Sequence, residues 1–410
     1  MKKNTARLAL AAASLALMSA CGGGGGDAIA ASPRLEVVAQ WDRLQYDLGD
    51  AQAEKAYNDA QGYKKVLMQG VQVDAQGNLY VSTARWGGKD VPATVSKLVK
   101  QADGSYKLQP FPSRAMNDVN NPAGLKAVLG FAIDRENVMW MLDQGHVEGV
   151  AASPRDEKLI GWDLTTNTEK YRIEFPDSLY DKRCSFLNDV AVDNDNGFVY
   201  IADSGINCDP LKGALMVYDY RNNKVRRILD GDVLTQDQAG FTFQIHGRKV
   251  LKNSPMRTGA DGIALSGDKK TLYWTNLTGN KLYSLPTTLL RDFTTPEATI
   301  KAAATSQAIP SNTDGLTADR DGNLYLTALT LNGIMKRDAA TGAVSTLVSD
   351  EAISWPDTLS WGPDGSLYFV SNHLHLWVDG DMNFDTPNAV PNFRIYRYTG
   401  TAGARPYTAK

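Results

Sequence analysis

The sequence is poor in histidine and cysteine, and neither charge is in excess. Its 410 residues include 4 histidines, 3 cysteines, 43 basic and 46 acidic residues, for a formal net charge of −3. Binding a nucleic-acid backbone needs a basic surface, so this composition argues against a nucleic-acid partner. The sequence also lacks HExxH, G-x-S-x-G, a phosphate-binding glycine loop and a dinucleotide fingerprint. Serine-hydrolase, kinase and Rossmann-type chemistry are therefore not supported.

Long apolar runs are absent as well, and the composition disfavours a helical bundle. The apolar segment at residues 8–18 is too short to cross a hydrocarbon layer of about 30 Å. What is abundant instead is 36 Gly, 17 Pro, 17 Tyr, 11 Phe and 8 Trp, which suits many short strands joined by tight turns. The chain is long enough to bury a sizeable core. These features predict an all-β fold.

The N-terminal segment has the features of a lipoprotein export signal. Lys2, Lys3 and Arg7 precede the apolar residues 8–18, and Cys21 follows small residues and precedes five glycines. We predict a signal peptide over 1–20 and a lipidated Cys21 with a glycine-rich tether over 21–34. The protein would then be anchored by its lipid in a bacterial cell envelope, at the outer membrane, facing the periplasm or the cell surface. Cleavage without lipidation would give a secreted protein.

The other two cysteines form a potential pair. If Cys21 carries a lipid, Cys184 and Cys208 remain in an oxidising compartment, where two thiols can close one disulfide. We predict that bridge; the alternative is two unpaired thiols on separate strands.

A repeated pattern governs the rest of the chain. An alternating apolar strand, an Asp/Asn/Gly turn and a second apolar strand with an aromatic residue recur six times. Because a single hairpin sheet cannot bury both faces, such repeats must stack around an axis. The repeats begin at Gly70, Gly130, Asp189, Gly262, Gly315 and Thr358, and their aromatic residues are Tyr80, Trp140, Tyr200, Tyr273, Tyr325 and Tyr368.

The repeat predicts a six-bladed β-propeller with four-stranded blades around a central channel. The propeller would fill residues 35–400, followed by a C-terminal tail at 401–410. We expect the ring to close by pairing residues 35–38 with residues 393–396 of the last blade, since an open ring would leave sheet edges unpaired.

Motifs along the chain resemble the yellow/major royal jelly protein family. Residues 37–41 and 46–47 are similar to the family's entry segment, and Arg85-Trp86 with residues 91–94 is similar to its "RW…GVPATL" signature. Further motifs follow in family order at 142–145, 200–204, 262–266, 282–287, 355–357, 370–372 and 392–395. The resemblance implies an exported six-bladed propeller with a central cavity. Members of the family include binders of small aromatic amines, nutritive or signalling proteins, and pigment-pathway proteins, so family alone does not fix function.

One column of residues should enter the central channel. Aligning the repeats places Gln69, Leu129, Asn188, Asp261, Asp314 and Asp357 at the starts of the innermost strands. Hard cations such as Ca²⁺ bind several carboxylate and carbonyl oxygens. Asn188, Asp261 and Asp314 are therefore candidate metal ligands, and Asp314 or Asp261 a candidate general base. The alternative is that each side chain hydrogen-bonds its own turn.

A more distant likeness supports the metal hypothesis. Asn188-Asp189 and Asp261-Gly262 resemble an Asn and an Asp that lactonase propellers of the regucalcin/gluconolactonase group use at blade starts. The glutamate that this group supplies from its first blade has candidates only in Glu36 and Glu54.

Other residues are candidates for ligand contacts. Arg85 and Trp86 could offer a cation and an aromatic wall, or could pack between blades. His373 and His375 would share one face of a strand as a rim pair, or face solvent. Three equivalent positions after the repeat aromatics, which could instead cap turns, are Asp143, Asp203 and Asn276.

Two functions follow from these observations. The first is an exported, monomeric propeller that binds a small molecule in its axial pocket, with Asp357 among the contacts. The second is a Ca²⁺-dependent hydrolase of lactones or esters. Metal content and turnover would separate the two.

Overall fold

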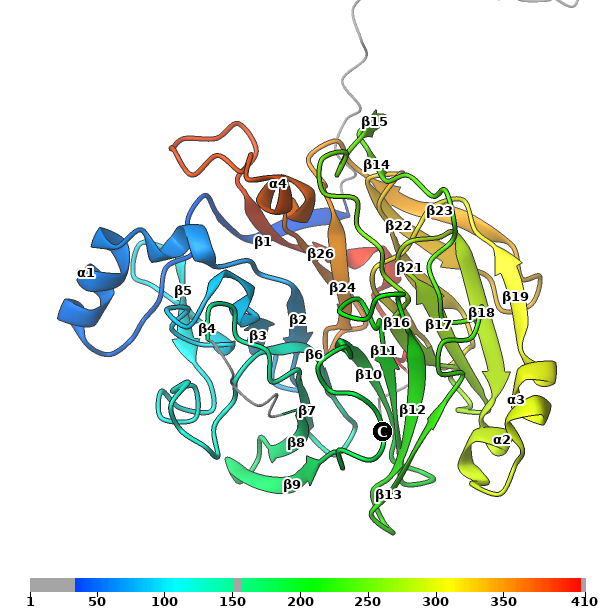
Figure 1. The fold of residues 1–410 in the computed structure, drawn as a ribbon. Helices are drawn as coiled ribbons and strands as arrows, with labels where there is room; N and C mark the ends of the chain where they lie inside the picture. The colour runs from blue at the N-terminus through cyan, green and yellow to red at the C-terminus, as the bar shows by residue number, and fades with distance from the viewer. Residues whose placement is uncertain (1–33, 151–156, 407–410) are drawn as a thin grey trace, which may run out of the picture. The chain divides into compact units, whose positions relative to one another are not determined.

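The computed structural model describes residues 34–150 and 157–406. Six antiparallel sheets of four strands each surround a central axis, which confirms the predicted six-bladed β-propeller (Figure 1). The predicted signal peptide, most of the tether and Cys21 lie outside the described residues.

The first strand of each blade lies at the axis. These six strands contact one another in a closed ring, β2–β6–β10–β16–β20–β24 and back to β2. Their bounds are β2 (Gly70–Val73), β6 (Val128–Ile133), β10 (Leu187–Asp193), β16 (Ala260–Leu265), β20 (Leu316–Ala318) and β24 (Pro356–Trp361). The second strands are β3 (Leu79–Ser82), β7 (Val138–Asp143), β11 (Phe198–Asp203), β17 (Thr271–Asn276), β21 (Leu324–Ala328) and β25 (Leu367–Ser371).

The outer half of each blade completes the sheets. The third strands are β4 (Val95–Lys100), β8 (Lys158–Asp163), β12 (Ala214–Asp219), β18 (Lys281–Pro286), β22 (Gly333–Arg337) and β26 (Phe393–Tyr398). The outermost strands are β5 (Tyr106–Pro110), β9 (Thr168–Glu174), β13 (Lys224–Ile228), β19 (Thr305–Ala308), β23 (Val344–Ser349) and β1 (Leu35–Trp41). Second strands are almost continuously buried, because neighbouring blades cover both of their faces.

The repeated Asp-and-aromatic pattern has a structural cause. In blade two, the turn residue Asp134 accepts a hydrogen bond from the Val138 amide at 3.0 Å and from the Trp140 indole at 2.8 Å. Blade five repeats the arrangement, with Asp319 accepting from the hydroxyl of Tyr325 at 3.0 Å. The carboxylate thus fixes the hairpin turn and satisfies the polar atom of a core aromatic.

The ring closes as the sequence predicts. Strand β1 pairs with β26 in an antiparallel register that runs from Leu35 opposite Tyr398 to Trp41 opposite Phe393. The chain's start thereby becomes the outermost strand of the sixth blade, which leaves no gap in the ring. Beyond the last strand, Pro406 forms an isolated bridge with Asp319 of the fifth blade.

Short helices and one extra hairpin decorate the blades. They are α1 (Ala51–Asp59), α2 (Thr287–Arg291), α3 (Glu297–Ala303), α4 (Leu374–Asp379), the 3₁₀ helices η1 (Gly62–Lys65), η2 (Arg85–Gly87) and η3 (Thr399–Thr401), and the hairpin β14 (Gln244–Ile245) with β15 (Arg248–Lys249). Within the described ranges, none of the helices is long and apolar enough to cross a membrane.

The predicted strand at His373–His375 is wrong. His373 adopts a left-handed conformation (φ 53°) at the start of α4, and His375 lies in that helix. The strand signal of β25 ends at Ser371, and the side chain of Asn372 then accepts a hydrogen bond from the Leu374 amide at 3.0 Å. This Asx-type turn starts the helix in place of a longer strand.

Candidate functional site

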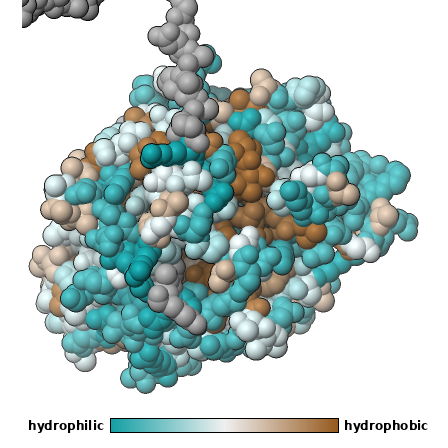
Figure 2. Space-filling model, turned by 180° about the vertical axis from the view of Figure 1, so that it is seen from behind, coloured by the Kyte–Doolittle hydropathy of each residue, from teal (hydrophilic) through white to brown (hydrophobic). Residues whose placement is uncertain are grey.

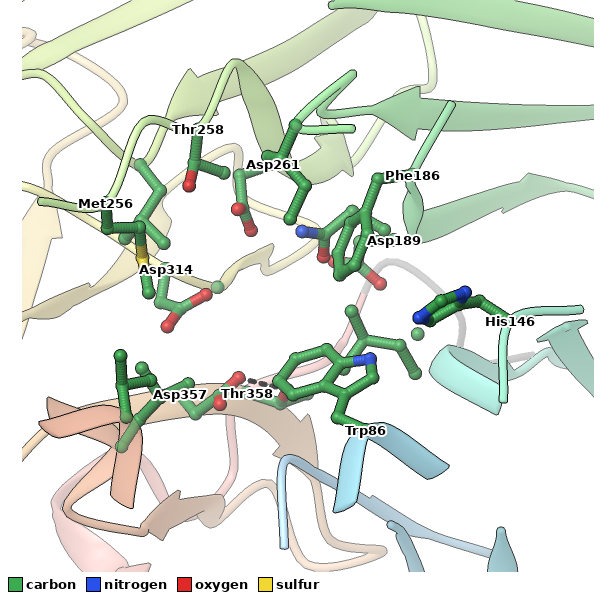
Figure 3. Close-up of a pocket in the computed structure, with 18 of the residues that line it drawn as sticks. Trp86, His146, Phe186, Asp189, Met256, Thr258, Asp261, Asp314, Asp357 and Thr358 are labelled. Carbon is green, nitrogen blue, oxygen red and sulfur yellow. Dashed lines mark hydrogen bonds between the residues drawn. The ribbon is translucent and has the colours of Figure 1, made fainter. Parts of the chain in front are cut away.

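A cavity of about 270 Å³ occupies the axis. Its floor is made by the starts of the innermost strands, and Figure 3 shows carboxyl groups from several blades directed into it. The apolar part of the walls consists of Trp86, Leu129, Phe186, Ile206, Met256, Leu277, Leu374 and Val378. The polar side chains of His146, Glu148, Asn207 and Thr258 also line the cavity.

The surrounding surface is mainly hydrophilic. Among the described residues, the large hydrophobic side chains that are exposed are Val37, Ile206 and Val233. Figure 2 shows hydrophobic residues gathered on one face and bordered by hydrophilic ones. Ile206, at 37% exposure, is also a lining residue of the axial cavity.

Four aspartates from four blades line the cavity: Asp189, Asp261, Asp314 and Asp357. Asp189, Asp261 and Asp357 lie within β10, β16 and β24, and each of these strands has a register irregularity at its start. A bulge re-aims side chains and leaves a residue unpaired, so these positions face the axis.

The glycines that follow two of these aspartates allow the inner strands to approach closely. A Cβ at Gly262 would lie 2.2 Å from the Asp314 carbonyl oxygen, and one at Gly315 would lie 2.5 Å from that of Asp357. The glycines of these Asp-Gly pairs are therefore required by backbone packing around the axis, since only glycine fits there.

Asp261 has the least hydrogen-bond support of the four acids. It is 2% exposed, and its Oδ2 has no hydrogen-bond partner among the described residues. Burial raises the pKa of Asp261 well above its usual value, and the neighbouring charges of Asp314, Asp357 and Asp189 raise it further. A buried carboxyl group without a cationic partner holds its proton more tightly.

Asp314 and Asp357 have partial support. Asp314 Oδ2 accepts a hydrogen bond from the Trp355 indole at 2.7 Å, yet burial still raises the pKa of Asp314 to about 6. Asp357 accepts from the Asn372 amide at 2.8 Å and from the Thr358 hydroxyl at 3.1 Å. Burial, followed by the charge of Asp314, raises the pKa of Asp357 well above its usual value.

Asp189 completes the acidic floor. Burial raises the pKa of Asp189 to about 7, although the Val190 amide donates to its carboxylate at 2.8 Å. None of the described residues that line the cavity is lysine or arginine. The floor therefore holds its protons up to a higher pH than free aspartates do, and a bound cation could replace them.

The predicted axial column is largely present, with one omission and one addition. Leu129, Asn188, Asp261, Asp314 and Asp357 line the cavity. Gln69 is not among the lining residues, because its Oε1 accepts from the Ala84 amide at 3.0 Å within its own blade. The predicted column does not include Asp189, since strict alternation along a strand allows Asn188 or Asp189 to face the axis but not both. The irregular register between Leu187 and Val190 brings in both.

Arg85 and Trp86 have different positions. Trp86 lines the cavity, and its indole donates to Gln144 Oε1 at 3.1 Å. Arg85 is not a lining residue of this cavity and is only 1% exposed. Its guanidinium donates to the carbonyl oxygens of Val91, Leu125, Lys126 and Asn117. Arg85 thus ties loops together, which is the packing alternative, and the expected cation for an anionic ligand does not reach the axis.

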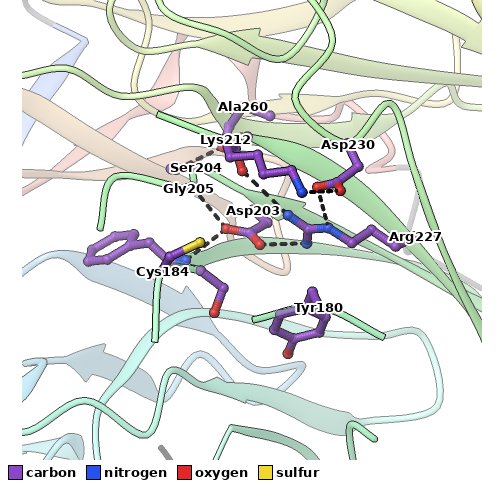
Figure 4. A network of polar contacts seen from close by, with 12 residues as sticks. Tyr180, Cys184, Asp203, Ser204, Gly205, Lys212, Arg227, Asp230 and Ala260 are labelled. Carbon is purple, nitrogen blue, oxygen red and sulfur yellow. Dashed lines mark hydrogen bonds and ion pairs between the residues drawn. The ribbon is translucent and has the colours of Figure 1, made fainter. Parts of the chain in front are cut away.

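The acids at the ends of the second strands also lie away from the cavity lining. Asp203 Oδ1 accepts from the amides of Phe186 and Gly205 at 2.7 and 2.9 Å, and its Oδ2 forms an ion pair with Arg227 at 2.6 Å. Figure 4 shows this network. Asp143 is engaged in the same way by backbone amides and by Lys158 at 2.8 Å.

Asn276 follows the same pattern in the fourth blade. Its side-chain amide donates to the Gln236 carbonyl at 2.7 Å. All three of these predicted ligand residues therefore fasten loops to blades, and the structure does not bring them to the axial cavity.

The predicted disulfide is present between Cys184 and Cys208. It joins the segments that supply Phe186, Ile206 and Asn207 to the cavity wall. The bridge therefore fastens one side of the cavity mouth.

The described side chains do not form a preorganised metal site. No group of three or more His, Cys, Asp or Glu side chains among residues 34–150 and 157–406 is arranged to hold a metal ion. Asn188 donates to Ser204 Oγ at 3.0 Å, and Asp314 and Asp357 each accept a hydrogen bond from another side chain. Glu36 and Glu54 pair with Arg397 and Lys107 instead of reaching the axis. The oxygen donors are of the kind that calcium binds, but the described side chains are not grouped as a metal site.

The chain is similar to solved structures at low sequence identity. A luciferin-regenerating enzyme superposes with a TM-score of 0.50 and 16% identity, covering 84% of this chain and 95% of that chain. A gluconolactonase from Xanthomonas campestris superposes with a TM-score of 0.49 and 14% identity, covering 88% of this chain and 89% of that chain. These likenesses concern the fold alone.

Comparisons with known sequences identify the family. Major royal jelly protein 1 of Apis mellifera is 24% identical over 398 residues, which cover 88% of this chain and 86% of that protein. Protein yellow of Drosophila madeirensis is 24% identical over 403 residues, covering 89% and 66%. Major royal jelly protein 6 of Apis mellifera is 25% identical over 266 residues, which cover 61% of this chain and 56% of that protein. A family model described as major royal jelly protein matches residues 126–404, and this chain therefore belongs to the major royal jelly protein family.

Proposed function

We propose that this propeller binds a small organic cation with an apolar body in its axial cavity. The observation that carries the proposal is the acidic floor, in which three buried aspartates (Asp261, Asp314 and Asp357) and the partly buried Asp189 line a cavity without a lining lysine or arginine among the described residues. A protonated amine could take the place of the protons that these carboxyl groups hold, because its charge would stabilise their ionised form.

The walls of the cavity suit the rest of such a ligand. Trp86 and Phe186 lie side by side at the wall with ring centroids 5.6 Å apart, and aromatic faces attract cations as well as apolar groups. A cavity of about 270 Å³ lies near the lower end of the usual range for small-molecule sites, roughly 300–1,000 Å³. It therefore favours a compact ligand with one ring over a larger one.

Calorimetric titration tests the proposal with a matched series of probes. Phenethylamine, the uncharged 2-phenylethanol and the anionic phenylacetate share one apolar body and differ in charge. We expect binding of the amine only, weakened at least tenfold by Asp261→Asn, which removes the group that can become anionic with little change of shape. Asp385→Asn is the control, because the Asp385 side chain is 99% exposed. Equal binding of all three probes would contradict the proposal.

A second candidate is calcium-dependent hydrolysis of a lactone or ester. It is favoured by the oxygen atoms of Asn188, Asp261 and Asp314, which border the same cavity. Titration with calcium alone tests it: stoichiometric binding that Asp261→Asn abolishes, with lactone turnover lost on chelation, would replace the first proposal.

We also propose that the chain is exported and anchored through Cys21. The charged and apolar pattern of residues 1–20 supports this. Cys21→Ser should move the protein from the membrane fraction to the soluble fraction of bacterial cells. Unchanged fractionation would argue against lipidation.

A further inference from the structure

Three of the four histidines gather where the hairpin β14–β15 meets α4. His246 occupies the turn between β14 and β15, His373 precedes α4, and His375 lies in its first turn. The rings of His373 and His375 are 6.4 Å apart, and His246 and His375 line one surface pocket. These three residues are called the histidine cluster below.

The folded arrangement favours the neutral form of each imidazole. His375 is 6% exposed, and its Nδ1 has no hydrogen-bond partner in the part of the chain that the structure describes. Burial, with the charges of His373 and His246, lowers the pKa of His375 to about 3. Burial likewise lowers the pKa values of His373 and His246, and a charge on His246 lowers that of His373 further.

Both acidic and basic side chains surround the histidine cluster. Glu351 raises the pKa of His246 and Arg248 lowers it, while Arg394 lowers that of His373. The other charged groups that line the shared pocket are Lys249, Lys252, Asp379 and Asp381. The carbonyl of Asn392 accepts a hydrogen bond from His373 Nδ1 at 2.9 Å, and this bond raises the pKa of His373 against the effect of burial.

The same helix forms part of the axial cavity. Leu374 and Val378 of α4 line the cavity. Trp355 connects the two places, because its ring stacks on His375 with centroids 5.9 Å apart and its indole donates to Asp314 at 2.7 Å. Displacement of α4 would remove a wall of the cavity and the neighbour of Trp355.

We propose that the histidine cluster is an acid-sensitive latch that holds α4 against the axial cavity at neutral pH and releases it when the histidines take up protons. Release exposes the imidazoles to water, where they titrate near pH 6.5. The released state then binds more protons than the closed state below that pH. Its population rises as the pH falls, since protons act as a ligand for the released state.

Hydrogen exchange of the α4 amides measures the latch directly. The amide of Leu376 donates to the His373 carbonyl at 2.8 Å in the closed form, so its protection reports closure. After correction for intrinsic exchange rates, opening should increase about 25-fold between pH 7 and pH 5 from His375 alone, given a closed pKa of about 3 and an open pKa of about 6.5.

Two variants and one control sharpen the test. His375→Phe keeps a ring on Trp355 and removes the titrating group, so opening should become nearly independent of pH. His246→Gln lies on an exposed turn and should reduce the pH response without disturbing the helix. Lys249→Gln removes a permanent charge from the same hairpin and should retain the wild-type response.

The proposed latch is contradicted if the α4 amides show the same degree of opening at pH 7 and pH 5. It is also contradicted if α4 of His375→Phe opens in acid as it does in the wild type. Since exchange is measured without any ligand, the result is independent of the proposed amine binding. If the amine binds but α4 stays closed in acid, only the latch fails.

Discussion

Buried aspartates occur in two settings in this propeller, and the two settings differ in their partners. Asp203, at the end of a second strand, accepts two amide protons and pairs with Arg227. Asp261, at the start of an innermost strand, has an oxygen without a partner among the described residues and lies near three further acids. Both carboxyl groups are almost inaccessible to solvent. The difference shows that burial alone does not distinguish a structural acid from a functional one, whereas its partners do.

The largest expected effect on stability comes from removing Asp203, the acid that has an ion-pair partner. Asp203→Ala leaves Arg227 buried, with its side chain 6% exposed, and removes the acceptor of two backbone amides. We expect a loss of about 3–5 kcal/mol in the free energy of unfolding, measured by urea denaturation. A loss below about 1 kcal/mol would show that Asp203 is dispensable and that the comparison between the two settings is wrong.

The disulfide should contribute the next largest effect. It closes a loop with a sequence separation of 24 between Cys184 and Cys208, next to the Phe186 and Gly205 amides that bind Asp203. The double variant Cys184→Ala/Cys208→Ala should lose about 3 kcal/mol in the free energy of unfolding. Combined with Asp203→Ala, its effect should be less than additive, because both changes release the same loop. Full additivity would show that the disulfide and Asp203 stabilise the fold independently and would contradict this expectation.

The unpaired setting should give stability a distinctive pH dependence. The pKa of Asp189 is about 7 in the folded protein against an ordinary value of 3.8, so the folded state binds more protons than the unfolded state between these values. Stability from this group is therefore fully present below about pH 4 and is lost as the pH rises through about 7. Between pH 5.5 and 8 we expect Asp189→Asn to remove about 1–2 kcal/mol of this change, which paired denaturation curves of variant and wild type would measure. Parallel curves would contradict it.

The smallest effect on stability is expected at Asp261. Replacing its carboxyl group in Asp261→Asn removes a buried acid that lacks a cationic partner, so the free energy of unfolding at pH 8 should stay within about 1 kcal/mol of the wild type or increase. Binding of the amine probe should nevertheless fall. A destabilisation as large as that of Asp203→Ala would assign Asp261 a structural role.

The sequence pattern predicts the blade architecture more completely than it predicts the residues of the site. Six hairpin repeats predicted six blades, and the apolar segment at residues 35–38 predicted the strand that closes the ring. These signals are local, because alternation and turn residues act within a few positions of the chain. The equivalent spacing of Asp143, Asp203 and Asn276 was just as regular, yet it corresponds to loop fastening away from the cavity lining.

The misplaced residues share one cause. The guanidinium of Arg85 donates to four carbonyl groups in three separate segments of the chain. The ion-pair partners of Asp143 and Asp203 are Lys158 and Arg227, which come from neighbouring strands. None of these partners is adjacent in the sequence. Asp189 lies outside the predicted column because a register irregularity replaces the simple alternation of an ideal strand.

The sequence by itself determined the number of blades, the closing strand, the cysteine pair that forms the disulfide and three of the four aspartates at the axis, because periodicity and turn chemistry act over short distances. Only the tertiary structure decided which buried acid has a partner, where the histidines meet and which side chains face the cavity. Those properties depend on groups brought together from distant parts of the chain, and the electrostatic environment of a carboxyl group is set by its neighbours in space.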